Sequence, residues 1–283
     1  MHIVSLTTCY NRCENTLASL KDLHEQELPD GVYLSYVIVD DGSTDGTTYA
    51  VKQHFSDVEI INGTGYLYWA GGMRYGWDHS VSRKSYDYLF VYNDDIHLYK
   101  DAIKQLLIGA NQVDYDGKGV NVIVGSFSDS TKKNTTYGGL VSNSWHPLRF
   151  ELIPAPIKMI TVDTLNMNGV LISSKTLNTV GFLSSDYIHK GADFEYGLKL
   201  RKKGGKVWVV PGYIGTCERN SSMGTSDELG ISKIEKIKRL TSLKEQPLLQ
   251  RAKYYKKYAG SFWFFLWLAP YFKAILINNK QKV

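Results

Sequence analysis

Cysteine is scarce in this chain, with three among its 283 residues: Cys9, Cys13 and Cys217. Three thiols build no disulfide framework. The C-x3-C spacing of the first two also lacks the second pair or the histidines that would complete a zinc site. We therefore expect free thiols in a reducing compartment, which favours a cytoplasmic protein.

Signals for secretion and for a membrane span are also missing. Residues 1–6 have neither a basic segment nor a long apolar core, so we expect no secretory leader. The most apolar stretch, residues 262–272, is too short for a transmembrane helix and contains Pro270. With 43% hydrophobic and 22% charged residues, the composition is that of a globular protein with an ample core.

Negative charge is nearly absent from the C-terminal region. Residues 231–283 hold twelve lysines and arginines against Glu235 and Glu245, a balance of +10 in a chain of net charge +5, so the remainder carries −5. This asymmetry predicts two regions with different tasks. We divide the chain into a body, residues 1–225, and a basic, aromatic-rich helical extension, residues 226–283.

Acidic residues, by contrast, follow directly after two apolar runs. The first run ends in Asp40 and Asp41, and the second ends in Asn93, Asp94 and Asp95. Short β-branched and aromatic runs are typical of buried strands, and ligands of open α/β sheets bind at the carboxyl ends of such strands. Because clustered carboxylates repel one another without a cation, the pattern indicates a metal-assisted site, although two solvated turns would also give it.

Strand-like and helix-like segments alternate through the first half of the chain. Strands are predicted at residues 3–8, 33–39, 58–62 and 88–92, with helices between them at 11–28, 44–55 (capped by Ser43 or Thr44) and 73–82. The second half is more mixed and includes a predicted hairpin at 132–140. The alternation predicts an α/β fold with a Rossmann-like, mostly parallel central sheet and helices on both faces.

Three motifs in order, over roughly residues 1–215, resemble the family 2 glycosyltransferases of the GT-A fold. They are the acidic pair 40–41 with the following Gly-Ser-Thr-Asp, the segment 93–95, and the segment 191–201. The resemblance is to rhamnosyltransferase-like enzymes of bacterial surface-polysaccharide synthesis. It implies a GT-A catalytic domain over residues 1–225 and a metal-dependent transferase of the hexosyltransferase type.

The resemblance assigns the nucleotide of a sugar donor, UDP or dTDP, to residues after the first two strands. Asp40 and Asp41 would accept hydrogen bonds from base and ribose, and Thr8, Asn11 and Arg12 resemble the loop that lines the same pocket. Thr8 is also compatible with an ordinary turn residue at the end of a strand.

The segment 93–95 resembles the family's DXD element. Asp95 would hold Mg²⁺ or Mn²⁺ beneath the diphosphate, and Asn93 and Asp94 would contact the donor. In the glycine-rich segment 63–74, Gly71 would let the backbone approach the diphosphate and Arg74 would add positive charge. Trp69 is equally compatible with stacking on a sugar and with filling the core.

The acceptor side rests on the segment 191–201. Asp193 matches the family's general base, and Glu195 the acid two positions on. Asn168 resembles a donor-sugar or acceptor contact. Where many relatives have a metal-binding histidine after the last strand, this chain has none, so Glu218 substitutes for it or the metal has fewer protein ligands; Arg219 would bind diphosphate.

The basic extension predicts contact with anionic lipid at the inner face of the cell membrane, where a lipid-linked glycan acceptor would lie. Packing on the body or on a second copy in a homodimer would explain the same pattern. The function predicted is thus an inverting glycosyltransferase that extends a bacterial cell-surface polysaccharide. A sugar-nucleotidyltransferase is the rival enzyme, although its basic glycine-rich first loop is missing here. A basic-tailed nucleic-acid-binding module is the non-enzymatic rival.

Overall fold

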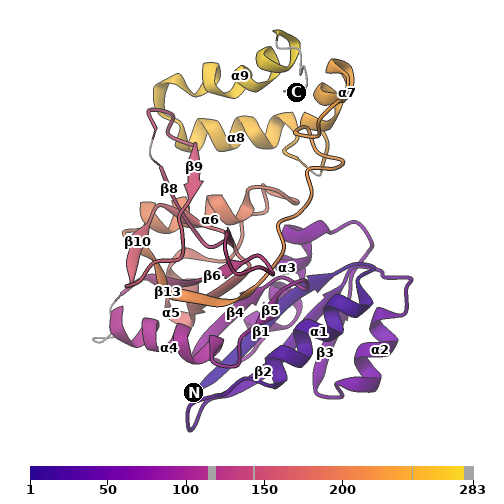
Figure 1. Cartoon of the computed structure of the whole chain (residues 1–283), viewed down its shortest axis with the longest axis vertical. Helices are drawn as coiled ribbons and strands as arrows, with labels where there is room; N and C mark the ends of the chain where they lie inside the picture. The colour runs from indigo at the N-terminus through magenta and orange to yellow at the C-terminus, as the bar shows by residue number, and fades with distance from the viewer. Residues whose placement is uncertain (114–118, 143, 244, 277–283) are drawn as a thin grey trace.

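The structure is a computed structural model that describes residues 1–113, 119–142, 144–243 and 245–276 (Figure 1). Its central sheet has the strand order β10-β13-β6-β12-β4-β1-β2-β3. The bounds are β1 His2–Cys9, β2 Tyr33–Asp40, β3 Val58–Asn62, β4 Tyr88–Tyr92, β6 Asn121–Ser128, β10 Ile160–Val162, β12 Gly169–Ser173 and β13 Lys206–Thr216. Strands β4-β1-β2-β3 pair in parallel, as do β6 and β13, whereas β12 runs antiparallel between β4 and β6.

Helices cover both faces of this sheet. Their bounds are α1 Cys13–His24, α2 Thr47–His54, α3 Tyr68–His79, α4 Ala102–Val113, α5 Ser174–Val180 and α6 Ala192–Lys202. Along β1, Val4 packs in the same buried cluster as Met73 of α3, whereas Ile3 packs with Ile103 of α4. Alternate residues of one strand thus serve opposite faces, so the strand is buried on both sides. The predicted α/β class is confirmed.

A smaller sheet, β11-β8-β9, lies beside the main one, with bounds β8 Gly139–Ser142, β9 Phe150–Leu152 and β11 Thr164–Leu165. The predicted hairpin at 132–140 is wrong. Strand β7, Thr135–Tyr137, pairs with β6, whereas β8 pairs with β9 and β11, so the two halves of the expected hairpin join different sheets. Each half instead pairs with its own neighbour along the chain, β7 with the preceding β6 and β8 with the following β9.

The predicted cap of α2 is also wrong. The helix begins at Thr47 after Gly46, whose φ is 86°, and the Asp45 carboxylate accepts the Thr47 N–H at 3.1 Å. The Ser43 hydroxyl instead accepts the Asn11 N–H at 2.9 Å. A side chain expected to start a helix therefore ties two loops at the carboxyl edge of the sheet.

The C-terminal extension consists of α7 Lys233–Leu240, α8 Leu248–Tyr258 and α9 Trp263–Leu276, which lie together at one end of the molecule (Figure 1). Tyr254 and Tyr255 of α8 belong to the same buried apolar cluster as Ala192 and Tyr196 of α6. The extension therefore packs on the body. No helix within the described ranges is both long and apolar enough to cross a membrane.

Candidate active site

The carboxyl ends of β1, β2 and β4 lie side by side. In the parallel register, Cys9 is opposite Asp40, and Leu6 is opposite Val91, three residues before Asp94. The two acidic segments and the loop after β1 therefore meet at one edge of the sheet, as the sequence predicts.

Asp40 and Asp41 are buried, and their carboxylates are engaged within the protein. Asp40 accepts the Ser43 N–H at 2.8 Å and the Thr48 hydroxyl. Asp41 accepts the backbone N–H groups of Gly65 and Leu67, each at 2.8 Å. Both side chains thus shape the loops around the pocket. Direct contact with base and ribose stays a prediction.

Thr8 and Asn11 also join segments around this edge. The Thr8 hydroxyl donates to the Val39 carbonyl at 3.1 Å, and Thr8 packs so tightly on α3 that a Cβ at Gly72 would lie 2.3 Å from its Oγ1. Asn11, with φ of 51°, accepts the Thr44 N–H at 2.7 Å. These contacts set how closely the first three loops approach one another.

Arg12 joins the two acids of the second segment. One guanidinium nitrogen donates to Asp94 at 3.1 Å and to Asp95 at 2.8 Å. Burial lowers the pKa of Arg12, but the two carboxylates outweigh it and raise that pKa. Arg12 therefore acts as the counter-ion of the acidic pair.

Asp94 is the more deeply buried acid. Burial raises its pKa to about 6, against the opposing pull of Arg12, and its Oδ2 is buried with no hydrogen-bond partner. Asp95 is 17% exposed and accepts a long contact, 3.8 Å, from the Cys217 thiol. Burial likewise raises the pKa of Cys217, so a neutral thiol lies against the carboxylate. No pattern in the sequence predicts that Cys217 is a neighbour of Asp95.

An open cavity of about 390 Å³ lies beside Asp95, within the usual size range of small-ligand sites. Its lining residues are Arg12, Asn15, Asp95, His97, Glu218, Arg219, Asn220 and Ser221. Glu218 accepts the Ser130 N–H at 2.8 Å, which holds the loop after β13. The predicted Arg12, Asp95, Glu218 and Arg219 are therefore brought together around one cavity.

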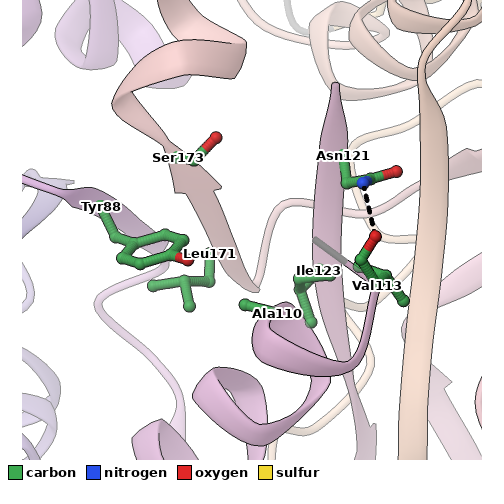
Figure 2. Close-up of a pocket in the computed structure, with 7 residues that line it drawn as sticks. All are labelled: Tyr88, Ala110, Val113, Asn121, Ile123, Leu171 and Ser173. Atoms are coloured by element: carbon green, nitrogen blue, oxygen red, sulfur yellow. Dashed lines mark hydrogen bonds between the residues drawn. The ribbon is translucent and has the colours of Figure 1, made fainter. Parts of the chain in front are cut away.

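A second hollow lies between β4, β12, β6 and α4 and is lined mainly by apolar side chains (Figure 2). Its volume is about 10 Å³, room for no more than one water molecule. Tyr88, at the start of β4, belongs to this lining, so the hollow lies toward the opposite end of that strand from Asp94. It is a packing gap in the core.

Asn93 and the glycine-rich segment are joined by Trp69, whose indole N–H donates to Asn93 Oδ1 at 2.8 Å. The sequence left two interpretations of Trp69 open, stacking on a sugar and filling the core. The structure shows that Trp69 is in addition a hydrogen-bond donor. Arg74 donates to the carbonyls of Ser184 at 2.9 Å and of Tyr187. Arg74 thus fixes the loop before α6, and Gly71 donates its N–H to Ile188 of the same loop at 3.3 Å.

Asp193 lies in the first turn of α6, partly covered. Burial raises its pKa to about 6, against the hydrogen bonds from the Phe194 N–H at 2.9 Å and from the Asn166 amide at 3.4 Å. Two residues after Asn166, the Asn168 amide donates to Cys217 Sγ at 3.8 Å. The segment 166–168 therefore bridges Asp193 and the Cys217–Asp95 pair.

Glu195, two residues after Asp193, is fully buried and lies away from the cavity lining. Its Oε1 accepts the Lys257 ammonium and the Tyr258 hydroxyl, each at 2.6 Å. The sequence assigned Glu195 to the acceptor side, and its partners on α8 were not foreseen. Its acceptor contact stays a prediction.

The acidic pair is compatible with a divalent cation. Oxygen donors from carboxylates are what Mg²⁺ and Mn²⁺ prefer, and Asp94 Oδ2 is an unpartnered buried acceptor. Over the described ranges no group of three or more His, Cys, Asp or Glu side chains is arranged to hold a metal. A cation here would be held by Asp95, with Asp94 as the next carboxylate.

Comparison with known proteins now identifies the fold. Among solved structures, the mannosyltransferase PcManGT from Pyrobaculum calidifontis, in complex with GDP-Man and Mn²⁺, matches with a TM-score of 0.53 at 16% identity. The match covers 97% of this chain and 70% of that one. The search of curated proteins finds no match. Residues 6–162 match the family model described as Glycosyl transferase family 2. The chain has the GT-A fold and belongs to glycosyl transferase family 2.

Proposed function

We propose that this protein is an inverting, divalent-cation-dependent glycosyltransferase. It moves a hexosyl or rhamnosyl unit from a nucleotide-diphosphate sugar to a hydroxyl of a lipid-linked glycan acceptor in bacterial surface-polysaccharide synthesis. The observation that carries the proposal is the bridge at residues 166–168, which ties Asp193 to the acidic pair beside the cavity. Family membership and the GDP-Man and Mn²⁺ of the solved relative support the donor class.

Each side chain has a task in this proposal. Asp193 takes the proton of the acceptor hydroxyl as its oxygen attacks the anomeric carbon, and the nucleoside diphosphate leaves. A carboxylate with a pKa of about 6 is ionised at neutral pH and is more basic than an ordinary aspartate. The cation, when bound, stabilises charge on the leaving diphosphate. Arg12 and Arg219 line the same cavity and supply further positive charge.

Asp193→Asn tests the base. The amide keeps the size of the side chain but takes no proton, so kcat should fall by about 10²–10⁴-fold while donor binding is kept. Asp57→Asn, which changes an exposed carboxylate before β3, is the matched control. Transfer by Asp193→Asn at the wild-type rate would refute the proposed reaction.

EDTA and Asp95→Asn test the cation. Chelation should stop transfer, and added Mn²⁺ should restore it in the wild type. Asp95→Asn should need a higher Mn²⁺ concentration for half-maximal rate because it loses one anionic ligand. Undiminished turnover in EDTA would remove the cation from the proposal.

The donor is best found by a binding screen. UDP-, dTDP- and GDP-sugars, each with Mn²⁺, should raise the unfolding temperature according to their affinity. The proposal predicts the largest shift for a UDP- or dTDP-sugar. A larger shift with the GDP-sugar would correct the base while leaving the reaction class intact.

The C-terminal extension supports a membrane-surface location. Phe265 and Phe272, 71% and 57% exposed, lie on one side of α9 by their spacing, and Phe262, 71% exposed, lies in the turn just before the helix. Trp263 and Trp267 pack toward the body instead. An exposed aromatic stripe beside basic helices fits the interface of an anionic bilayer.

Vesicle flotation tests this location. The wild type should float with vesicles containing phosphatidylglycerol and stay behind with phosphatidylcholine alone, and Phe265→Ser with Phe272→Ser should release it. Tyr66→Ser, at a residue 81% exposed on the body, is the control. A concentration-dependent dimer without flotation would assign the stripe to a second copy instead.

A further inference from the structure

One side of α8 contacts the N-terminal part of α6 and the loop before it. Gln250, Tyr254, Lys257 and Tyr258 recur at intervals of three and four residues, the spacing of a single helix face. Each has a partner between residues 187 and 195, the segment that leads into and contains Asp193.

The strongest contact is at Glu195. Its side chain has no exposed surface, and its carboxylate receives both Lys257 and Tyr258 at 2.6 Å. Glu195 Oε2 has no hydrogen-bond partner. A buried carboxylate is costly unless it is paired, so the position of α6 depends on the two donors from α8.

The loop before α6 is held by the same helix and by the segment just before it. Gln250 accepts the Ile188 N–H at 3.4 Å and donates to the Lys190 carbonyl at 3.2 Å. The Lys190 ammonium pairs with Glu245, which is largely buried, at 2.6 Å. On its other side, the Ile188 carbonyl accepts the Ala70 N–H of α3 at 3.1 Å. The loop therefore lies between the glycine-rich segment and α8.

Tyr254 completes the contact between these end points. Its ring lies edge-on to that of Tyr187, with centroids 6.1 Å apart. Burial, followed by the negative charge of Asp193, raises the pKa of its phenol. The α8 face thus runs from the start of the loop, past Asp193, to Glu195 one half-turn further along α6.

We propose that α8 positions the acceptor side of the active site, with Lys257 and Tyr258 acting through Glu195 as positioning residues for Asp193. The inference rests on the proposed function, in which Asp193 is the base. It makes the C-terminal extension a part of the catalytic unit in addition to any membrane role. Asp193 and Glu195 share the first turn of one helix, so a tilt or slide of α6 moves both.

Lys257→Met tests the coupling, with Lys257→Arg as the conservative variant and Lys256→Met, at the next exposed lysine, as the control. A displacement of about 1 Å at a reacting group can lower the rate by about 10²-fold. We expect kcat of Lys257→Met to fall by that order while the KM for the donor stays within about twofold. Lys257→Arg should recover most of the loss, and Lys256→Met should behave as wild type.

Loss of folded protein must be separated from loss of position. The amount of competent protein is measured by the stoichiometry of UDP or dTDP binding with Mn²⁺, and kcat is expressed per binding site. Leu106→Ala, in the α4 core, supplies a variant destabilised elsewhere and should keep its kcat per site. If Lys257→Met does not fold, Glu195→Gln with Lys257→Met removes both charges together and should still show the lowered kcat.

The outcomes separate this inference from the proposed function. Full activity of Asp193→Asn would overturn the function and the inference together. A loss of activity in Asp193→Asn, combined with wild-type kcat per site in Lys257→Met or in the double variant, would overturn only the positioning role. An equal fall of kcat in Leu106→Ala would also overturn it, because the effect would then follow stability alone.

Discussion

The pH dependence of turnover depends on the environment of Asp193. Burial raises its pKa from 3.8 to about 6, against the pull of the Phe194 N–H, the Asn166 amide and Lys190. A general base works only when ionised, so activity is present above this pKa and is lost as pH falls through it. We predict an acid limb in kcat centred near pH 6.

The size of the effect follows from the two pKa values. With a pKa of about 6, roughly 91% of Asp193 is ionised at pH 7 and roughly 9% at pH 5, so kcat falls about tenfold. With the ordinary value of 3.8, roughly 94% would remain ionised at pH 5 and kcat would hardly change. The difference is large enough to measure directly.

Asp94 complicates the profile because burial also raises its pKa to about 6. A variant that shifts the pKa of Asp193 and leaves that of Asp94 unchanged would show which of the two carboxylates causes the limb. The Asn166 amide donates to Asp193 and lowers its pKa, so Asn166→Leu should move the acid limb to higher pH. Within the described part of the chain Asn166 makes no hydrogen bond to Asp94, so a limb caused by Asp94 would stay in place.

The assay measures the initial rate of nucleoside diphosphate release at saturating donor and acceptor. The pH is varied between about 4.5 and 8, which covers both sides of the limb. Circular dichroism at each pH excludes unfolding as the cause. A limb near pH 4, or a limb near 6 that Asn166→Leu leaves unmoved, would refute the assignment of Asp193 as a base with a raised pKa.

Three further predictions concern the loops around the cavity. Gly72→Ala puts a Cβ 2.3 Å from the Thr8 hydroxyl and should cost about 1–3 kcal/mol in thermal unfolding. The double variant Gly72→Ala, Thr8→Ala should recover part of this loss, because the Cβ of residue 8 would still lie 2.9 Å away. An unchanged unfolding temperature of Gly72→Ala would contradict the tight approach of α3 to β1. Asp41→Asn loses a charged acceptor of backbone N–H groups. It should lower the free energy of unfolding in urea by about 1.5–3 kcal/mol and weaken donor binding. A loss of binding with unchanged stability would mean that the loops do not need this carboxylate. Arg12→Met removes the counter-ion of Asp94 and Asp95. Mn²⁺ should therefore raise the unfolding temperature of this variant more than that of the wild type. Equal shifts would show that the guanidinium and the cation do not share a site.

Elements with one uninterrupted pattern could be predicted from the sequence to the residue. Strand β4, Tyr88–Tyr92, has the bounds that its apolar run predicts. Strand β13, by contrast, continues past Pro211 to Thr216, with register shifts between Val209 and Gly215 that let the proline lie in the strand. A proline ends a strand in the sequence pattern, and only the partner strands show that this one resumes.

The meeting of the two acidic segments was predictable because parallel strands bring their carboxyl ends to one edge. The partners of each carboxylate were not. Asp41 accepts N–H groups from residues 65 and 67, and Arg74 reaches carbonyls more than a hundred positions along the chain. Such pairs depend on loop paths, and turn residues such as glycine and serine permit many paths.

Glu195 shows why the chemistry of a motif and the role of each residue in it must be argued separately. An acid in the first turn of a helix is compatible with dipole stabilisation, with acceptor binding and with a salt bridge, and the motif alone does not choose among them. In the structure its carboxylate has no exposed surface and faces Lys257 and Tyr258, which come from beyond the residues that carry the family resemblance. Glu195, two residues from the candidate base, is therefore bound by the C-terminal extension, which the charge distribution predicted to be a separate region. A truncation before α7 should consequently impair transfer even where no membrane is present.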